Sequence, residues 1–259
     1  MLRRSAYLLL FIVLAVGCGR RDEPAARSDA ATIAAKRVEV VREAPGIDVL
    51  FIGNSYTFSH SLPKVLEQIA AATQGGPIFR TKMVAHPDYT LQQHWQLGEA
   101  AATIAEGGWE FVVLQGHSLS TLEARDRLYR FARRYAPLIK ESGARPAFFM
   151  TWARRGRPEM METIGPAYAA IAAELDAVLV PAGFAWLTSA EQRPDIHLHH
   201  ADGSHPSPAG SYLAAAMFYD LLGDGTSCVG SDHAGFGYLD TEEIRFLQET
   251  ALRHTRKGP

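Results

Sequence analysis

The stretch that decides the fold is IDVLFIGNSYT, residues 47–57. Val49 to Ile52 form a continuous apolar run of strand-forming side chains, which is typical of a strand buried on both faces of a parallel sheet. Gly53 ends this run, because glycine permits a tight turn that residues with a Cβ resist. Ligands of open α/β sheets bind at the carboxyl ends of the strands. Ser55 therefore occupies the position of a nucleophile, although serine is also a routine turn residue.

Strand-like and helix-like segments alternate along the rest of the chain. Further strands are expected at residues 78–85, 111–114, 147–150 and 178–180, and helices at residues 62–73, 90–106, 122–141, 158–175, 208–222 and 241–254. Pro166 should kink or split the helix that contains it. This alternation predicts an α/β fold with a parallel sheet of about five strands, covered by helices on both faces. Right-handed crossovers bring the carboxyl ends of the strands to one edge. That edge should carry Ser55, His86, Gln115 and Trp152.

The first 46 residues differ in composition from the rest. Two arginines precede a short apolar run at residues 6–16, which suits a signal peptide and is too short to cross a bilayer comfortably. The run ends in LAVGC, residues 14–18, which is similar to the lipobox of bacterial lipoproteins, with Leu14 four residues before the cysteine instead of three. We predict a lipoprotein signal peptide at residues 1–18 with lipidation of Cys18, a flexible tether at residues 19–46, and one domain at residues 47–259. An ordinary signal peptide and an uncleaved anchor are the alternatives.

Size and charge limit the classes of function. The 259 residues, 47% of them hydrophobic, suffice for one α/β domain with a full core. The formal net charge of -2 gives no electrostatic reason to expect binding to nucleic acid. If Cys18 carries a lipid, Cys228 has no partner for a disulfide within the chain.

The second informative stretch is HLHHADGSHPSP, residues 197–208. Asp202 precedes His205 by three residues in a loop rich in glycine and proline, and a short loop can fold the carboxylate onto the imidazole ring. That contact would fix the tautomer, so that the other ring nitrogen can take a proton from a serine. The chain contains no Gly-x-Ser-x-Gly elbow, which disfavours the α/β-hydrolase fold.

These two stretches resemble the SGNH/GDSL hydrolase superfamily. GNSY, residues 53–56, resembles its block I, with Asn54 where aspartate is usual, and DGSHPS, residues 202–207, is similar to its block V. The resemblance extends from residue 47 to the C-terminus. It implies a three-layer α/β/α flavodoxin-like fold and hydrolysis of esters or related bonds. It also implies that Ser55 is the nucleophile, His205 the base and Asp202 the residue that orients the base.

The resemblance further implies an oxyanion hole made by the serine N–H, a glycine N–H after the second strand and an asparagine side chain after the third. HPDYTL, residues 86–91, has no glycine, and Asp88 lies near the expected position. Its N–H is available, while its carboxylate would oppose an oxyanion unless it points away. LQGHS, residues 114–118, replaces the usual Gly-x-Asn-Asp, and a bacterial branch of the superfamily shares this Leu-Gln pattern. We predict Gln115 as the side-chain donor; the alternative is that it only satisfies local backbone groups.

Asn54 and Trp152 are predicted to line the substrate pocket, although a large aromatic side chain is more often packed in the core. Arg154, Arg155 and Arg157 could favour an acidic or phosphate-bearing substrate, but a solvated charge run is the more ordinary interpretation. No role is assigned to His60 or His117, which also lie near the predicted edge.

The predicted function is a serine esterase anchored to a bacterial cell envelope by its N-terminal lipid, either in the periplasm or on the outer surface. It would act on a small-molecule or glycan ester without a cofactor. One alternative is a non-catalytic ligand-binding lipoprotein, suggested by the missing glycine and the altered third block. Another is a metal-dependent hydrolase that uses the cluster His197, His199, His200, Asp202 and His205, although its spacing matches no compact zinc motif.

Overall fold

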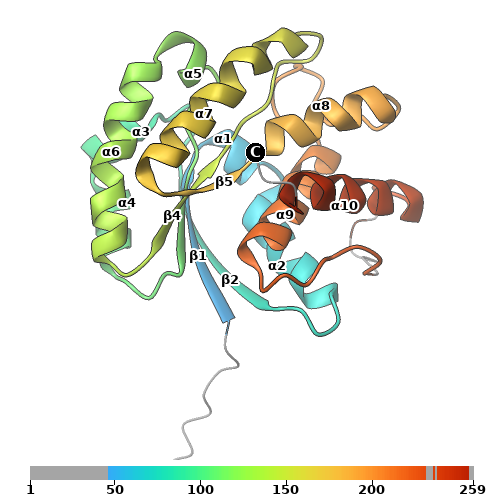
Figure 1. Cartoon of the computed structure of the whole chain (residues 1–259), viewed down its shortest axis with the longest axis horizontal. Coiled ribbons are helices and arrows are strands. Elements are labelled where there is room, and N and C mark those ends of the chain that lie inside the picture. Colours follow the sequence, from blue (N-terminus) through green and yellow to red (C-terminus); the bar gives the residue numbers. More distant parts are fainter. Residues whose placement is uncertain (1–45, 232–235, 237, 257–259) are drawn as a thin grey trace, which may run out of the picture. The chain divides into compact units, whose positions relative to one another are not determined.

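A five-stranded parallel sheet with the order β2-β1-β3-β4-β5 lies at the centre of the computed structural model (Figure 1). The strands are β1 (Gly46–Gly53), β2 (Ile78–Ala85), β3 (Phe111–Leu114), β4 (Arg145–Phe149) and β5 (Val178–Val180). The structure describes residues 46–231, 236 and 238–256. The predicted signal peptide, Cys18 and the tether up to residue 45 therefore lie outside the described residues.

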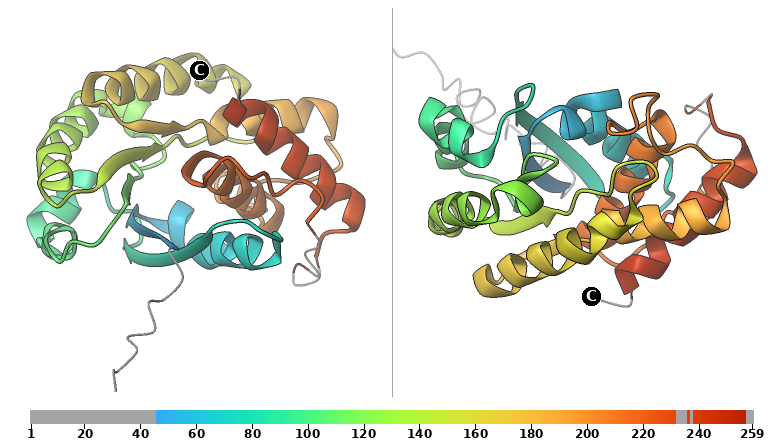
Figure 2. Two further views of the ribbon diagram at one scale, coloured as in Figure 1. Left: turned by 60° about the horizontal axis from the view of Figure 1, so that its bottom comes forward. Right: turned by 90° about the horizontal axis from the view of Figure 1, so that it is seen from above.

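Helices cover both faces of the sheet, which confirms the predicted three-layer α/β/α fold (Figures 1 and 2). The helices are α1 (Ser55–Phe58), α2 (Leu62–Ala72), α3 (Leu91–Leu97), α4 (Glu99–Ala105), α5 (Ser120–Glu123), α6 (Arg125–Glu141), α7 (Met161–Leu175), α8 (Ala182–Gln192), α9 (Pro208–Leu222) and α10 (Thr241–Arg256). Alternate residues of β1 point to opposite faces of the sheet, and each face packs against its own layer of helices. Val49 and Phe51 face the core under α2 and α9, whereas Leu50 and Ile52 face the core under α3, α4, α6 and α7.

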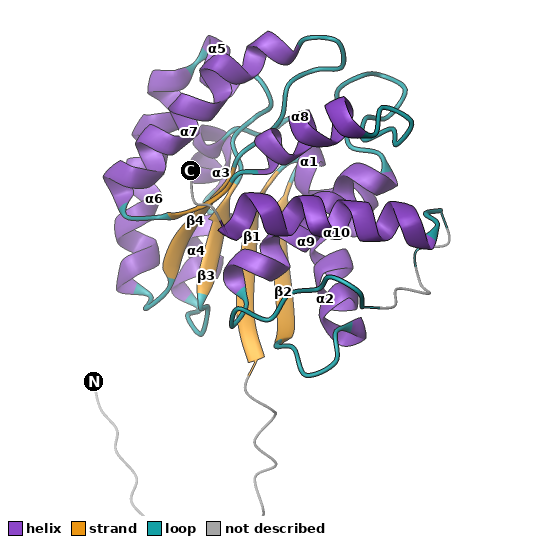
Figure 3. Ribbon diagram, turned by 45° about the vertical axis from the view of Figure 1, so that its right-hand side comes forward, coloured by secondary structure: helices purple, strands orange, loops and turns teal. Residues whose placement is uncertain are grey.

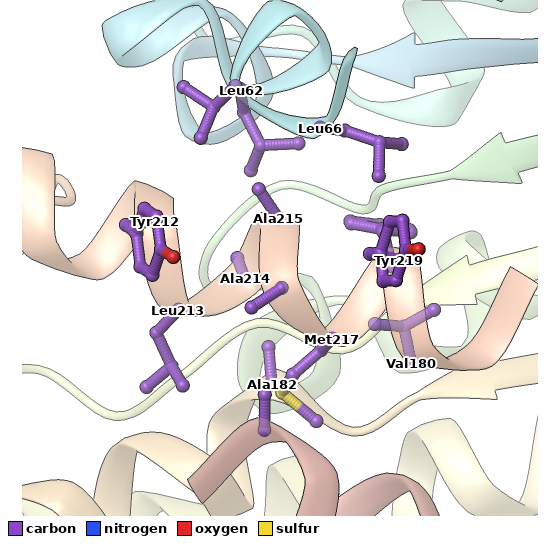
Figure 4. Close-up of a cluster of buried hydrophobic side chains, with 14 of the residues drawn as sticks. Leu62, Leu66, Val180, Ala182, Tyr212, Leu213, Ala214, Ala215, Met217 and Tyr219 are labelled. Atoms are coloured by element: carbon purple, nitrogen blue, oxygen red, sulfur yellow. The ribbon is translucent and has the colours of Figure 1, made fainter. Parts of the chain in front are cut away.

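Helix α9 is buried almost along its whole length between α2 and α10. Figure 4 shows Leu62 and Leu66 of α2 on the Ala215 side of α9, and Ala182 on the opposite side near Met217. Small side chains in the middle of α9 let these neighbours approach closely, and burial of an apolar helix on all sides is typical of a core position. Within the residues that the structure describes, no helix has the length and apolar character needed to cross a bilayer.

The structure differs from the predicted elements at four places. The expected helix at residues 90–106 is divided at Gly98, whose φ of 83° ends α3 and precedes α4. The helix expected at residues 122–141 is preceded by the single turn α5 and begins after Ala124. Pro166 does not split α7; instead a short 3-10 turn, Pro158–Met160, precedes that helix. Helix α8 was not among the helices expected from the sequence.

One carboxylate at the end of α9 makes stability depend on pH. Asp220 Oδ1 accepts a hydrogen bond from Cys228 N–H (3.3 Å), while Oδ2 is buried without a partner among the described residues. Burial raises the pKa of Asp220 to about 6. An acid whose pKa is raised on folding favours the folded state below its unfolded pKa, and this contribution is lost as the pH rises through about 6.

We therefore expect Asp220→Asn to raise the free energy of unfolding by about 1–3 kcal/mol at neutral pH, since the amide carries no buried charge. The gain should shrink to nothing near the unfolded pKa of 3.8. Urea unfolding of both proteins across this pH range is the measurement. A difference that does not change with pH would show that Asp220 does not titrate in this way.

Candidate active site

Ser55 stands at the carboxyl end of β1, as the first residue of the single turn α1 (Figure 3). Asn54 caps this turn: its Oδ1 accepts a hydrogen bond from Tyr56 N–H (3.1 Å). Gly53 is required here because neighbouring side chains lie close to it, whereas the sequence analysis attributed it to a tight turn. A Cβ at this position would come under 3.0 Å from Thr57 Oγ1 and Gln115 Oε1, so a close approach of side chains excludes any larger residue.

The structure brings together the three residues predicted to carry the chemistry. Ser55 Oγ donates to His205 Nε2 (2.9 Å), and His205 Nδ1 donates to Asp202 Oδ2 (2.6 Å). The other carboxylate oxygen, Asp202 Oδ1, accepts hydrogen bonds from the N–H groups of Ser204 (2.8 Å) and His205 (3.0 Å). The Ser204 N–H, followed by the His205 side chain, holds the pKa of Asp202 far below its usual range. The carboxylate is therefore ionised, keeps the proton of His205 on Nδ1 and leaves Nε2 free to accept one from Ser55.

The loop that carries Asp202 and His205 is fixed at several points. His199 and Pro206 form an antiparallel bridge across its base. The Arg155 side chain donates to the carbonyls of His199 (2.8 Å) and His200. His60 Nε2 lies 3.1 Å from the Pro206 carbonyl. These contacts give His205 a defined position opposite Ser55.

Gln115, predicted as an oxyanion donor, is not available for that role. Its Oε1 accepts from Asn54 N–H (2.8 Å) and Thr57 Oγ1 (2.9 Å), and its Nε2 donates to Asn54 Oδ1 (3.0 Å) and to the Gly116 carbonyl. The side chain is only 1% exposed and is absent from the lining of the cavity at Ser55. The prediction was wrong because the carboxamide supports the Asn54–Thr57 turn, and its donors are already used.

We expect Gln115→Ala to lower the free energy of unfolding by about 2–4 kcal/mol, because it removes buried atoms and leaves Asn54 N–H and the Thr57 hydroxyl without their acceptor. Chemical unfolding of the purified variant measures this loss. Unchanged stability combined with a large fall in kcat would instead restore Gln115 as an oxyanion donor.

A cavity of about 150 Å³, here called the Ser55 cavity, lies beside the serine. Its lining consists of Asn54, Ser55, Tyr56, Asp88, His117, Ser118, Arg154, Asp202, Ser204 and His205. Asn54, predicted as a pocket residue, is among them. Asp88 has a φ of 58°, in the left-handed region that favours glycine, at the turn that follows β2. Its backbone therefore adopts a conformation suited to the glycine that the resemblance implies, and its N–H has no hydrogen-bond partner among the residues described.

His117, to which the sequence analysis assigned no role, also lines the Ser55 cavity. Its Nδ1 accepts a long hydrogen bond from Leu119 N–H (3.4 Å). The neutral ring then carries its proton on Nε2, for which no partner is found in the described part of the chain. One feature of the sequence could have marked His117 as a residue of this cavity: it lies in the loop after β3, two residues beyond Gln115.

Trp152 is a packing residue and not the predicted pocket wall. It is 2% exposed and is not part of the lining of the Ser55 cavity. Its ring stacks between Tyr56 (centroids 4.6 Å apart) and Trp186 (3.8 Å apart), and its Nε1 donates to the Ser204 carbonyl (3.0 Å). The Tyr56 ring in turn meets the His205 imidazole edge-on, with centroids 5.6 Å apart. Trp152 thus packs against the loop that carries Asp202 and His205 and helps to hold it in place.

The histidine cluster does not converge on a metal position. Among the described residues, no group of three or more His, Cys, Asp or Glu side chains could hold a metal ion. His199 Nε2 lies 2.9 Å from the Ala153 carbonyl, and both nitrogens of His205 are engaged by Asp202 and Ser55. The geometry of these side chains gives no support to the metal-dependent alternative.

Comparison with solved structures identifies the fold. A candidate SGNH hydrolase from Slackia heliotrinireducens is 26% identical over 69% of this chain and 100% of its own, with a TM-score of 0.57. A DUF4886 family protein from Bacteroides uniformis is 18% identical over 81% of this chain and 94% of its own, with a TM-score of 0.63. A variant of Axe2, an acetyl-xylooligosaccharide esterase from Geobacillus, is 15% identical over 68% of this chain and 94% of its own, with a TM-score of 0.54.

No family model matches the chain, and no curated protein matches it in sequence. These structural relatives nevertheless resemble this chain in fold, and their descriptions include hydrolases. The Slackia protein is similar to this chain in fold and, at 26% identity, also in sequence. The chain therefore belongs to the SGNH/GDSL hydrolase-like superfamily, and its similarity to the Slackia protein supports a hydrolase function.

Proposed function

We propose that the protein is a serine esterase in which Ser55, His205 and Asp202 act as nucleophile, general base and orienting carboxylate. The observation that supports this most strongly is the continuous hydrogen-bond chain Ser55–His205–Asp202. Ser55 Oγ attacks the ester carbonyl while His205 Nε2 takes its proton, and His205 returns that proton to the leaving alcohol. Water, activated by His205, then hydrolyses the acyl-enzyme and frees Ser55.

The proposed oxyanion hole combines the backbone N–H groups of Ser55 and Asp88 with the Nε2–H of His117. All three residues line the Ser55 cavity. The Asp88 side chain is exposed, so solvent screens its carboxylate from the developing negative charge. His117 would supply the side-chain donor that Gln115 does not provide.

We expect His117→Ala to lower kcat about 10- to 1000-fold with a small change in KM, because the lost hydrogen bond would be strongest in the transition state. Steady-state kinetics with para-nitrophenyl acetate measures the loss. His197→Ala is the matched control, since His197 is exposed and lies outside the Ser55 cavity. Equal kcat in the wild type and His117→Ala would remove His117 from the oxyanion hole.

The Ser55 cavity is small, which favours a short acyl group such as acetyl. The similarity to an acetyl-xylooligosaccharide esterase supports an acetylated glycan or a comparable small ester as the substrate. From the N-terminal sequence alone we further propose attachment to a bacterial envelope through a lipid on Cys18. Mass analysis of the mature N-terminus tests that attachment, and a chain that begins well before or after Cys18 would contradict it.

The test of the proposed function is hydrolysis of para-nitrophenyl esters of increasing acyl length by the purified protein. We expect turnover of the acetate ester, declining with chain length and unaffected by a chelator. Turnover abolished by a chelator and restored by zinc would favour the metal-dependent alternative. No turnover of any ester would favour the non-catalytic binding protein.

A further inference from the structure

Arg154 has a position that the esterase mechanism does not explain. It follows β4 and lines the Ser55 cavity. It also lines a second cavity of about 330 Å³, here called the side cavity, whose lining includes Ala153, Pro158, Trp186 and Leu187. Arg154 therefore stands at the boundary between the space beside the nucleophile and a larger, mainly apolar space.

Among the described residues its guanidinium has no carboxylate partner, in contrast to several other arginines of the fold. Arg157 pairs with Glu159, Arg133 with Glu174 (2.6 Å) and Arg193 with Asp195 (2.7 Å). The only side-chain hydrogen bond of Arg154 within the described residues runs from Nη2 to the Ser118 hydroxyl and is long, at 3.4 Å. Most of its five N–H donors therefore remain available in the Ser55 cavity.

Neither acidic residue of the Ser55 cavity satisfies Arg154. Asp202 is occupied by His205 and two backbone N–H groups. Asp88 extends from the turn after β2 and makes no ion pair with Arg154 among the residues described. The Arg154 guanidinium is half-buried, and its planar fork matches a carboxylate in two parallel hydrogen bonds.

Hydrogen bonds hold the backbone of this segment in place. Arg155 N–H donates to the Gly203 carbonyl (2.9 Å), and the Arg154 carbonyl accepts from Arg157 N–H (3.0 Å). The first of these bonds ties the segment directly to the loop that carries Asp202 and His205. The position of Arg154 is thereby coupled to that of the catalytic loop.

We propose that Arg154 binds a carboxylate on the alcohol part of the substrate, so that the preferred substrate is a short-chain acyl ester of an acidic molecule. The inference rests on the proposed esterase function. The acyl group occupies the small Ser55 cavity, and the alcohol part extends past Arg154 toward the side cavity.

The test compares two esters that differ in charge at one position, meta-acetoxybenzoate and meta-acetoxybenzamide. Arg154→Gln should lower kcat/KM for the benzoate about 10- to 100-fold more than for the benzamide, since it removes a charge-assisted hydrogen-bond pair. Arg154→Lys should retain part of the preference as a point charge. Arg157→Gln, which removes an exposed arginine paired with Glu159, should leave both values unchanged. Equal losses for both esters, or the same loss in Arg157→Gln, would overturn the proposal.

A binding measurement separates this inference from the esterase proposal. Titration calorimetry of meta-acetoxybenzoate with Ser55→Ala and with the double variant Ser55→Ala, Arg154→Gln requires no turnover. We expect binding to weaken about 10- to 100-fold in the double variant. If the wild type hydrolyses neither ester but this difference is found, the esterase proposal fails and the anion site stands. Equal affinities would refute the anion site whatever the activity.

Discussion

Ser55→Ala is expected to lower kcat by about 10⁴- to 10⁶-fold, while the free energy of unfolding changes by less than about 1 kcal/mol. Within the described part of the chain, the serine hydroxyl bonds to His205 Nε2 alone, and Ser55 lies half-buried at the start of a single turn. Its removal leaves the backbone N–H of residue 55 in place, so we expect substrate binding and part of the proposed oxyanion hole to survive. The loss therefore concerns the covalent step and not the fold.

Active-site titration and steady-state kinetics with para-nitrophenyl acetate measure the effect, and urea unfolding checks the fold. Ser59→Ala is the matched control, because its hydroxyl lies four residues further along and makes no hydrogen bond within the described part of the chain. Equal kcat in the wild type and Ser55→Ala would contradict a serine nucleophile at this position.

Asp202→Asn is expected to lower kcat about 10³- to 10⁴-fold through a change of tautomer at His205. An asparagine can keep the two hydrogen bonds from the N–H groups of Ser204 and His205 on its carbonyl oxygen. Its amide nitrogen then faces His205 Nδ1, which must become an acceptor. The imidazole proton moves to Nε2, and that nitrogen can no longer accept the proton of Ser55.

The tautomer is observable by ¹⁵N chemical shifts of the imidazole, and kcat is measured on the same samples. We expect the proton on Nδ1 in the wild type and on Nε2 in the variant. A variant that keeps the Nδ1 proton and wild-type kcat would show that Asp202 does not orient His205. A variant that loses activity only by unfolding would be recognised by its denaturation curve.

The sheet and the meeting of Ser55, Asp202 and His205 could be predicted because their signals are local. Each strand is a short apolar run. Ser55 follows β1 in one short motif, and Asp202 and His205 lie three residues apart in another. The parallel topology then brings the two motifs to one edge of the sheet without further information.

The roles of Gln115, Trp152 and Arg154 could not be predicted, because contacts with distant segments decide them. The side-chain oxygen of Gln115 accepts hydrogen bonds from Asn54 and Thr57, which lie about 60 positions away in the sequence. Trp152 stacks on Trp186 of α8, a helix that the sequence analysis did not predict. Arg154 and Arg157 look alike in sequence, yet only Arg157 has a carboxylate beside it.

The central claim is that Ser55 is the nucleophile of an esterase. Its most direct test is reaction of the purified protein with a fluorophosphonate, followed by mass analysis of the peptides. The account predicts one adduct per chain, on Ser55, which forms at a much lower rate in Asp202→Asn and is absent in Ser55→Ala. An adduct on another residue, or active hydrolysis of esters by a protein whose Ser55 stays unlabelled, would contradict the account.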